Sequence, residues 1–250
     1  MTPPVQLHIE VPEDSPFFAG HFPGHPVLPG IAHLAFVARA LGDGPIAEVR
    51  TLKLRRPVFP GDTLDLVLEE GEEGLVRFDL RRGEEAVSSG VVRRGGNGET
   101  YATDLFSPVP SRFPPPRDLV PHAPPALLVQ SLVEVSATGA TAIGTIPEDS
   151  PFADRGRVHA FVGLEAGAQA AAALEALDRR GREEAGPRIG YVVGIRNAWF
   201  GVSWLPTGQA LPITVKPAGS APPLTIYEVR LGGEPELLFG LVSTYLDPAP

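Results

Sequence analysis

The sequence lacks cysteine altogether among its 250 residues, which excludes disulfide bonds and thiolate chemistry. Lysine is scarce, and the formal net charge is −9 at pH 7, which argues against nucleic acid as the main partner. Long apolar runs are missing as well. The most apolar stretch, residues 158–177, contains Glu165 and Glu175, which favours a buried helix over a membrane span. The first ten residues have neither the basic nor the apolar segment of a secretory signal, so the prediction is a cytoplasmic protein.

The composition that remains is that of an ordinary globular protein. Apolar residues make up 43% of the chain, which is enough for a packed core. A chain of 250 residues fits either one large domain or two domains of common size. The choice between one domain and two depends on internal similarity.

An exact repeat divides the chain. The hexapeptide PEDSPF occupies residues 12–17 and again residues 147–152, 135 positions later. Each copy follows a segment that alternates apolar and polar residues, as a strand does, and each precedes a segment with helical periodicity, residues 31–41 and 161–177. Several β-rich runs separated by Gly and Pro follow each helix. A single irregular domain with a coincidental hexapeptide is the alternative, but order and spacing agree as well as the letters do.

The repeat predicts an α+β protein of two similar halves, each an antiparallel sheet with one principal helix. Residues 96–117 are polar and rich in Pro and Gly, as expected of a linker. The predicted organisation is therefore an N-terminal domain of residues 1–95, the linker of residues 96–117, and a C-terminal domain of residues 118–250.

The first half carries a diagnostic loop. Residues 20–31 read GHFPGHPVLPGI, which closely resembles the signature of the β-hydroxyacyl-[acyl carrier protein] dehydratases, enzymes with the hot-dog fold. The letters that match the family pattern in register are those of His21, Phe22, Pro23, Gly24, Pro26, Pro29 and Gly30. The resemblance implies a double hot-dog fold, with two tandem domains packed as an intramolecular pseudo-dimer. It also implies an enzyme, a hydro-lyase that converts (3R)-hydroxyacyl thioesters to trans-2-enoyl thioesters.

The catalytic pair of that family is divided between the halves. In the family a carboxylate follows the histidine by fourteen residues, where this chain has Ala35. The second half lacks the histidine loop, but its helix reads GLEAGAQA over residues 163–170 and resembles the family's acidic helix, with Glu165 and Gln169 in place. The halves also resemble the paired dehydratase subunits of aryl-polyene pigment biosynthesis. Because family members place the histidine of one subunit against the carboxylate of the other, we expect one composite site between His21 and Glu165.

The resemblance implies a role for each site residue. His21 is the base that removes the C2 proton, and Glu165 orients or protonates the 3-hydroxyl group. We expect burial to raise the pKa of Glu165, so that it carries a proton near neutral pH. Gln169, one turn after Glu165, is expected to hold the carboxylate, and the backbone N–H of Gly30 is expected to stabilise the thioester oxyanion. The residues expected to contact substrate are Phe22, Pro23, Gly24 and Pro29.

The remaining histidines receive no catalytic role; for His159 the prediction is a structural one, and His25, His33 and His122 are unassigned. No metal-ligand spacing and no phosphate-binding Gly loop is present, so we predict neither metal nor bound cofactor beyond the thioester carried by acyl carrier protein or CoA. Arg50, Arg55 and Arg56 are candidates for contacting an acidic carrier protein.

Two other functions are compatible with the sequence. A hot-dog thioesterase would use the carboxylate and a water molecule, and a non-catalytic scaffold would bind carrier protein without turnover. Retention of one complementary His and Glu pair counts against the scaffold. The acyl chain length, the choice of carrier, the pathway and any further oligomerisation are left open by the sequence.

Overall fold

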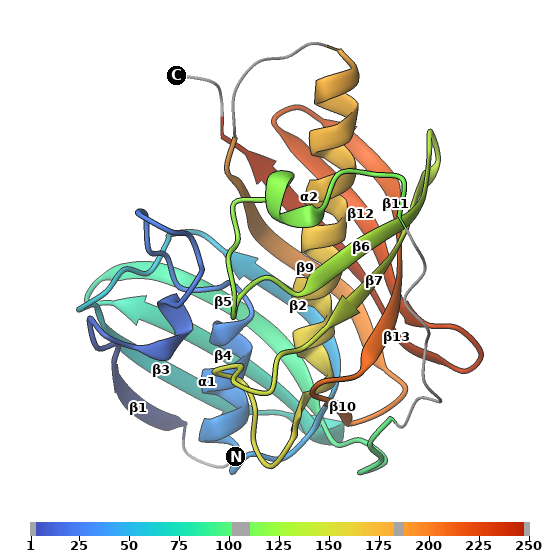
Figure 1. Ribbon diagram of the computed structural model, residues 1–250. Coiled ribbons are helices and arrows are strands. Elements are labelled where there is room, and N and C mark those ends of the chain that lie inside the picture. The colour runs from blue at the N-terminus through green and yellow to red at the C-terminus, as the bar shows by residue number, and fades with distance from the viewer. Residues whose placement is uncertain (1–3, 102–110, 183–187, 248–250) are drawn as a thin grey trace.

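The computed structural model describes residues 4–101, 111–182 and 188–247. Most strands join one antiparallel sheet, along which α1 (Ala32–Ala40) and the longer α2 (Gly163–Gly181) lie (Figure 1). The first half of the sheet has the spatial order β1 (Val5–Glu10), β3 (Thr63–Glu70), β4 (Leu75–Arg82), β5 (Glu85–Arg94) and β2 (Ile46–Leu54). The second half continues with β9 (Gly190–Phe200), β13 (Glu236–Leu246), β12 (Leu224–Gly232), β11 (Ala210–Ala221), β7 (Gly139–Thr145) and β6 (Val129–Ser136).

The strand order repeats between the halves, as the hexapeptide repeat predicts. The order β1, β3, β4, β5, β2 recurs as β7, β11, β12, β13, β9, and β6 is an additional edge strand. The halves join where β2 pairs antiparallel with β9, with Leu52 opposite Ile195. A separate small sheet pairs β8 (Arg157–His159) with β10 (Trp204–Pro206). The predicted α+β architecture with two repeated sheet-and-helix units is confirmed.

The predicted linker is only partly described. Residues 102–110 lie outside the described residues. On their N-terminal side, Thr100 forms a parallel bridge with Trp204. On their C-terminal side, Pro116–Asp118 form a 3₁₀ turn. The ends of the segment thus contact the second half of the fold.

Helix α2 forms because its sequence suits a long buried helix. Alanine, which has the highest helix propensity, dominates it, and acidic Glu165 in the first turn and basic Arg179 and Arg180 in the last turn complement the helix dipole. Small residues let it approach the sheet closely. A Cβ atom added to Gly167 would lie 2.1 Å from Cγ1 of Val229 on β12, so no larger residue fits there without displacement.

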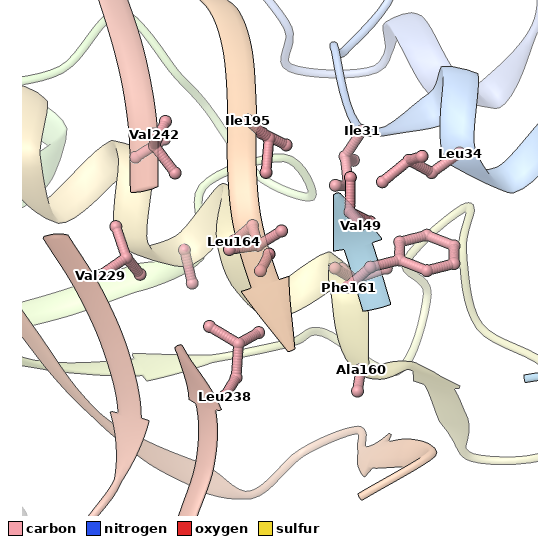
Figure 2. Packing of buried hydrophobic residues seen from close by; sticks show 14 of the residues in the cluster. Ile31, Leu34, Val49, Ala160, Phe161, Leu164, Ile195, Val229, Leu238 and Val242 are labelled. Atoms are coloured by element: carbon pink, nitrogen blue, oxygen red, sulfur yellow. The ribbon is translucent and has the colours of Figure 1, made fainter. Parts of the chain in front are cut away.

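The hydrophobic core is continuous across the two halves. One buried cluster, part of which is drawn in Figure 2, includes Leu34 and Val49 of the first half together with Leu164, Ile195 and Val242 of the second. Full burial of one such side chain stabilises the fold by about 1.5–3 kcal/mol. The core therefore holds the two halves in a fixed relation. Within the described residues, no helix has the length and apolarity needed to cross a membrane.

Candidate active site

A cavity of about 490 Å³ is lined by residues from both halves. The first half contributes the loop before α1 and the segment after β2. The second half contributes one face of α2 and the start of β9. The polar and charged side chains on its wall are those of His21, His33, Arg55, Arg56, His122, Glu165, Gln169, Glu175, Tyr191, Thr244 and Tyr245.

The loop between β1 and α1 fixes the imidazole of His21. The backbone N–H of Val27 donates to the carbonyl of His21 at 3.1 Å, and Nδ1 of His21 lies 2.8 Å from the carbonyl oxygen of Val27. A carbonyl oxygen only accepts, so Nδ1 carries the hydrogen and Nε2 of the neutral ring has a free lone pair. The backbone N–H of Leu28 then donates to the carbonyl of Val58 at 2.9 Å. Nε2 of His21 is thereby available as a base.

Glu165 lies in the first turn of α2 and is held by Gln169, as the i, i+4 spacing predicts. Nε2 of Gln169 donates to Oε1 of Glu165 at 3.1 Å and to the carbonyl of Ala126 at 2.8 Å. Oε1 of Gln169 accepts from the backbone N–H of Leu128 at 2.8 Å. Both ends of the amide are therefore engaged, and the side chain connects the acidic helix to the segment before β6.

His122 also lies in the site, where sequence reasoning gave it no role. It is buried, and Nε2 of its imidazole is 3.4 Å from Oε1 of Glu165, an ion-pair contact without well-aligned hydrogen-bond geometry. Its ring centroid is 5.0 Å from that of His21. One side-chain nitrogen or oxygen atom from each of His21, His122 and Glu165 lies within 4.8 Å of those from the other two. The site thus joins residues from three distant segments of the chain.

Burial and mutual charge set the ionisation of the pair. Burial lowers the pKa of His21 to about 4, although the Glu165 carboxylate opposes the change. The imidazole is therefore neutral at pH 7, as a base requires. Burial alone would raise the pKa of Glu165, but His122, His21 and the hydrogen bond from Gln169 outweigh it and lower the pKa to about 2. The predicted rise is wrong in direction, because sequence reasoning did not place a second histidine beside the carboxylate.

The other predicted site residues divide into two groups. Gly30 and Phe22 line the cavity, and among the described residues none accepts a hydrogen bond from the backbone N–H of Gly30. Pro23 and Gly24 do not line it, because they form the exposed turn between His21 and Val27. Pro29 lines a small neighbouring cavity, whose wall also includes His21 and Glu165.

Aromatic packing surrounds His159 and joins the two hexapeptides. His159 lies between the second hexapeptide and α2, and its ring stacks on Phe161 at a centroid distance of 5.0 Å and lies tilted against Trp204 at 4.3 Å. The two hexapeptides also meet, with the rings of Phe17 and Phe152 5.0 Å apart. These contacts fit the predicted structural role of His159.

Comparison with family models assigns both halves. Residues 114–246 match the model of the ApeP-like family, described as ApeP dehydratase, and residues 2–91 match the ApeI-like model, described as ApeI dehydratase. The chain belongs to the ApeP-like dehydratase family, with an ApeI-like segment preceding the ApeP-like one. The predicted resemblance to a fusion of two dehydratase subunits is confirmed.

The curated relatives that match parts of the chain are themselves named as dehydratases. The chain is 41% identical over 103 residues to 3-hydroxyacyl-[acyl-carrier-protein] dehydratase FabZ of Thermus thermophilus, an alignment that covers 36% of this chain and 66% of that protein. A FabZ of Wolbachia from Drosophila simulans is 42% identical over 65 residues, covering 21% of this chain and 46% of the relative. The chain therefore spans less than two thirds of the length of these relatives.

Solved structures confirm the fold of this ApeP-like family member. The dehydratase domain of PpsC from Mycobacterium tuberculosis superposes with a TM-score of 0.67 at 18% identity, covering 98% of this chain and 94% of that one. The dehydratase heterocomplex ApeI:P from Xenorhabdus doucetiae gives a TM-score of 0.51 at 24% identity, covering 55% of this chain and 93% of that one. The predicted double hot-dog fold is confirmed.

Proposed function

We propose that the chain dehydrates 3-hydroxyacyl thioesters to trans-2-enoyl thioesters in the cavity shared by its halves. The observation that carries the proposal is the meeting of His21 and Glu165, from opposite halves, on one cavity wall. Each belongs to a segment that matches a dehydratase family model. Dehydration requires a base at C2 and an acid or orienting group at the 3-hydroxyl, and these two side chains provide that combination.

The proposed reaction starts at His21. Its neutral Nε2 removes the C2 proton, and charge develops on the thioester oxygen. The N–H of Gly30, near the N-terminus of α1, is available to that oxygen; loss of one such donor costs about 3–4 kcal/mol in related sites. The Glu165 carboxylate accepts a hydrogen bond from the 3-hydroxyl group and orients it. Hydroxide leaves from C3 while the C2=C3 double bond forms, and uptake of one proton completes the water that the reaction releases.

We also propose that the chain works as an intramolecular pseudo-dimer. Residues 1–95 would be the His-bearing domain and residues 118–250 the Glu-bearing domain, joined by residues 96–117. The repeated strand order and the antiparallel pairing of β2 with β9 support this division. One polypeptide then forms one working site, because each half has kept one member of the pair.

The proposed activity is tested by incubating the chain with a 3-hydroxyacyl thioester and analysing the products by mass spectrometry. We expect loss of one water with the thioester intact. A thioesterase would instead release free thiol, which a thiol-trapping reagent detects. The ionised Glu165 carboxylate would suit that hydrolysis as well, so both assays are needed. Thiol release without enoyl product would replace the dehydratase proposal with the thioesterase.

The natural substrate is proposed to be carried by an acyl carrier protein. Arg55 and Arg56 are exposed and lie on the cavity wall, where they can meet an acidic carrier. Arg56 is paired with Glu85 at 2.8 Å, whereas Arg55 donates to the neutral Oγ of Ser89. Arg50 does not line the cavity, and its Nε lies 3.5 Å from Oε1 of Glu48. Arg55 is therefore the candidate with a full positive charge to offer.

Replacement of Arg55 by glutamate is expected to raise the KM for a carrier-bound substrate about 3- to 10-fold, because reversing one charge at an interface rim costs about 1 kcal/mol. A short soluble thioester analogue should be affected much less, since it lacks the acidic partner. Arg50→Glu, in the preceding strand β2 but off the cavity wall, is the matched control. Equal increases in KM for both substrates would argue against carrier recognition by Arg55.

A further inference from the structure

One buried histidine on the cavity wall has no part in the proposed reaction of His21 and Glu165. His122 is 8% exposed, lies on the cavity wall, and contacts Glu165 through Nε2. Its second ring nitrogen, Nδ1, has no hydrogen-bond partner among the described residues. A buried imidazole without a structural partner costs stability, so a functional explanation is warranted.

We propose that His122 holds the proton that Glu165 delivers to the leaving 3-hydroxyl group, so that the site is a three-residue proton-transfer centre. The inference rests on the proposed dehydration. His122 contacts the carboxylate and acts through it, and is therefore a positioning residue that also supplies the proton.

A third group is needed to supply the proton for the leaving hydroxyl group, because neither His21 nor Glu165 brings one. His21 removes a proton in the step that expels hydroxide, and a group that accepts a proton cannot donate one in the same step. Glu165 is ionised at pH 7, because its pKa is lowered to about 2. Neither residue therefore brings a proton for the leaving group. His122 Nε2, 3.4 Å from Oε1 of Glu165, is close enough to supply one through a small adjustment.

The proton balance closes within the three residues. His122 transfers its proton to the Glu165 carboxylate, and Glu165 passes a proton on to the oxygen of the 3-hydroxyl group as the C3–O bond breaks. In the same step the C2–H bond breaks, its proton moves to Nε2 of His21, and its electron pair forms the C2=C3 double bond. Glu165 ends as a carboxylate, as it began. After reaction His21 is protonated, His122 is neutral and water has formed, so the net charge of the three residues is unchanged.

Few other charges act on His122. The groups whose rings or oxygens it meets directly are those of His21, Phe22 and Glu165. The other titratable side chains on the cavity wall are those of His33, Arg55, Arg56, Glu175, Tyr191 and Tyr245. Among the described residues, Glu165 is the only carboxylate within ion-pair distance of His122, so it is the only partner of this kind to which the imidazole can pass a proton directly.

The test is His122→Gln, which keeps an N–H donor near the Nε2 position but cannot carry the extra proton. We expect kcat to fall about 100-fold with KM within about threefold of wild type, because proton supply is lost and binding is not. Removing His122 also leaves burial as the main influence on Glu165, so its pKa rises and residual activity shifts to lower pH. His159→Gln, a half-buried, aromatic-stacked histidine away from the cavity wall, is the matched control with wild-type behaviour.

The outcomes are distinguishable. A wild-type chain that makes no enoyl product contradicts the proposed dehydration itself. An active wild type with a His122→Gln variant of unchanged kcat, or of reduced kcat with an unchanged pH optimum, contradicts the role of His122. If the variant does not fold, ¹⁵N-histidine NMR of the wild type decides. We expect Glu165→Gln to change the ring-nitrogen signals of one buried imidazole, because the partner that shares its proton is lost; ring-nitrogen signals that do not change would overturn the proposal.

Discussion

Replacing His21 by asparagine, or Glu165 by glutamine, is expected to lower kcat for dehydration by about 10²–10⁴-fold. The first change removes the base. The second removes the negative charge that binds the 3-hydroxyl group and that contacts His122, the proposed source of the proton. Because the two side chains act on one substrate in one cavity, their effects should not add. The double variant is expected to be no more than about tenfold slower than the slower single variant.

The matched control is His25→Gln, in the same loop but exposed and directed toward Phe59. It should keep kcat within about twofold, and circular dichroism should show all variants folded. Initial rates of enoyl thioester formation provide the measurement. Either single variant with full activity would remove that residue from the mechanism. Strictly multiplicative losses in the double variant would indicate that the two side chains act independently, without the coupling expected of one composite site.

The sequence predicts the fold well because the repeat contains long-range information. Two copies of one hexapeptide, each between a strand and a helix, imply two units with the same order of elements, and the strand order of the sheet follows that order. The first half lacks the carboxylate of the family motif and the second half lacks its histidine, and this complementary loss predicts that His21 and Glu165 share one site. The pairing of the halves is thus inferred from Ala35, where the carboxylate is missing, as much as from the residues that are present.

Other features of the site depend on packing that no local pattern reveals. His122 is separated from Glu165 by β6, β7, the second hexapeptide and β8, and sequence reasoning gave it no role. The ionisation of Glu165 depends on that neighbour, so its pKa could not be predicted from burial alone. Pro23 and Gly24 match the family letters, but they shape the turn that presents His21 and do not line the cavity. A motif predicts the conformation of the loop, whereas the contacts that each of its residues makes depend on the chain packed around it.

The loop that holds His21 contacts the segment that holds His122, and this contact can be tested at Gly20, which has a φ of 77°. Its carbonyl accepts a hydrogen bond of 3.0 Å from the N–H of Ala123, the neighbour of His122. A Cβ atom at Gly20 would lie 2.0 Å from the carbonyl oxygen of Ala123, a backbone atom that cannot rotate away. An alanine at position 20 must therefore displace one loop from the other.

Gly20→Ala is expected to lower the free energy of unfolding by about 2–4 kcal/mol, through backbone strain at positive φ and the steric conflict with Ala123. It should also lower kcat about 10- to 100-fold, because displacement of His21 by about 1 Å misplaces the base at C2 relative to the groups that act at C3. Gly24→Ala is the matched control, since Gly24 has a φ of 78° but a Cβ atom there would have no neighbour within 4 Å. It carries the backbone strain alone, about 1–2 kcal/mol, and should leave the geometry of the three residues intact. Urea denaturation and initial rates for the two variants measure the difference. Equal stability and equal kcat in the two alanine variants would show that the contact between Gly20 and Ala123 does not align the loops.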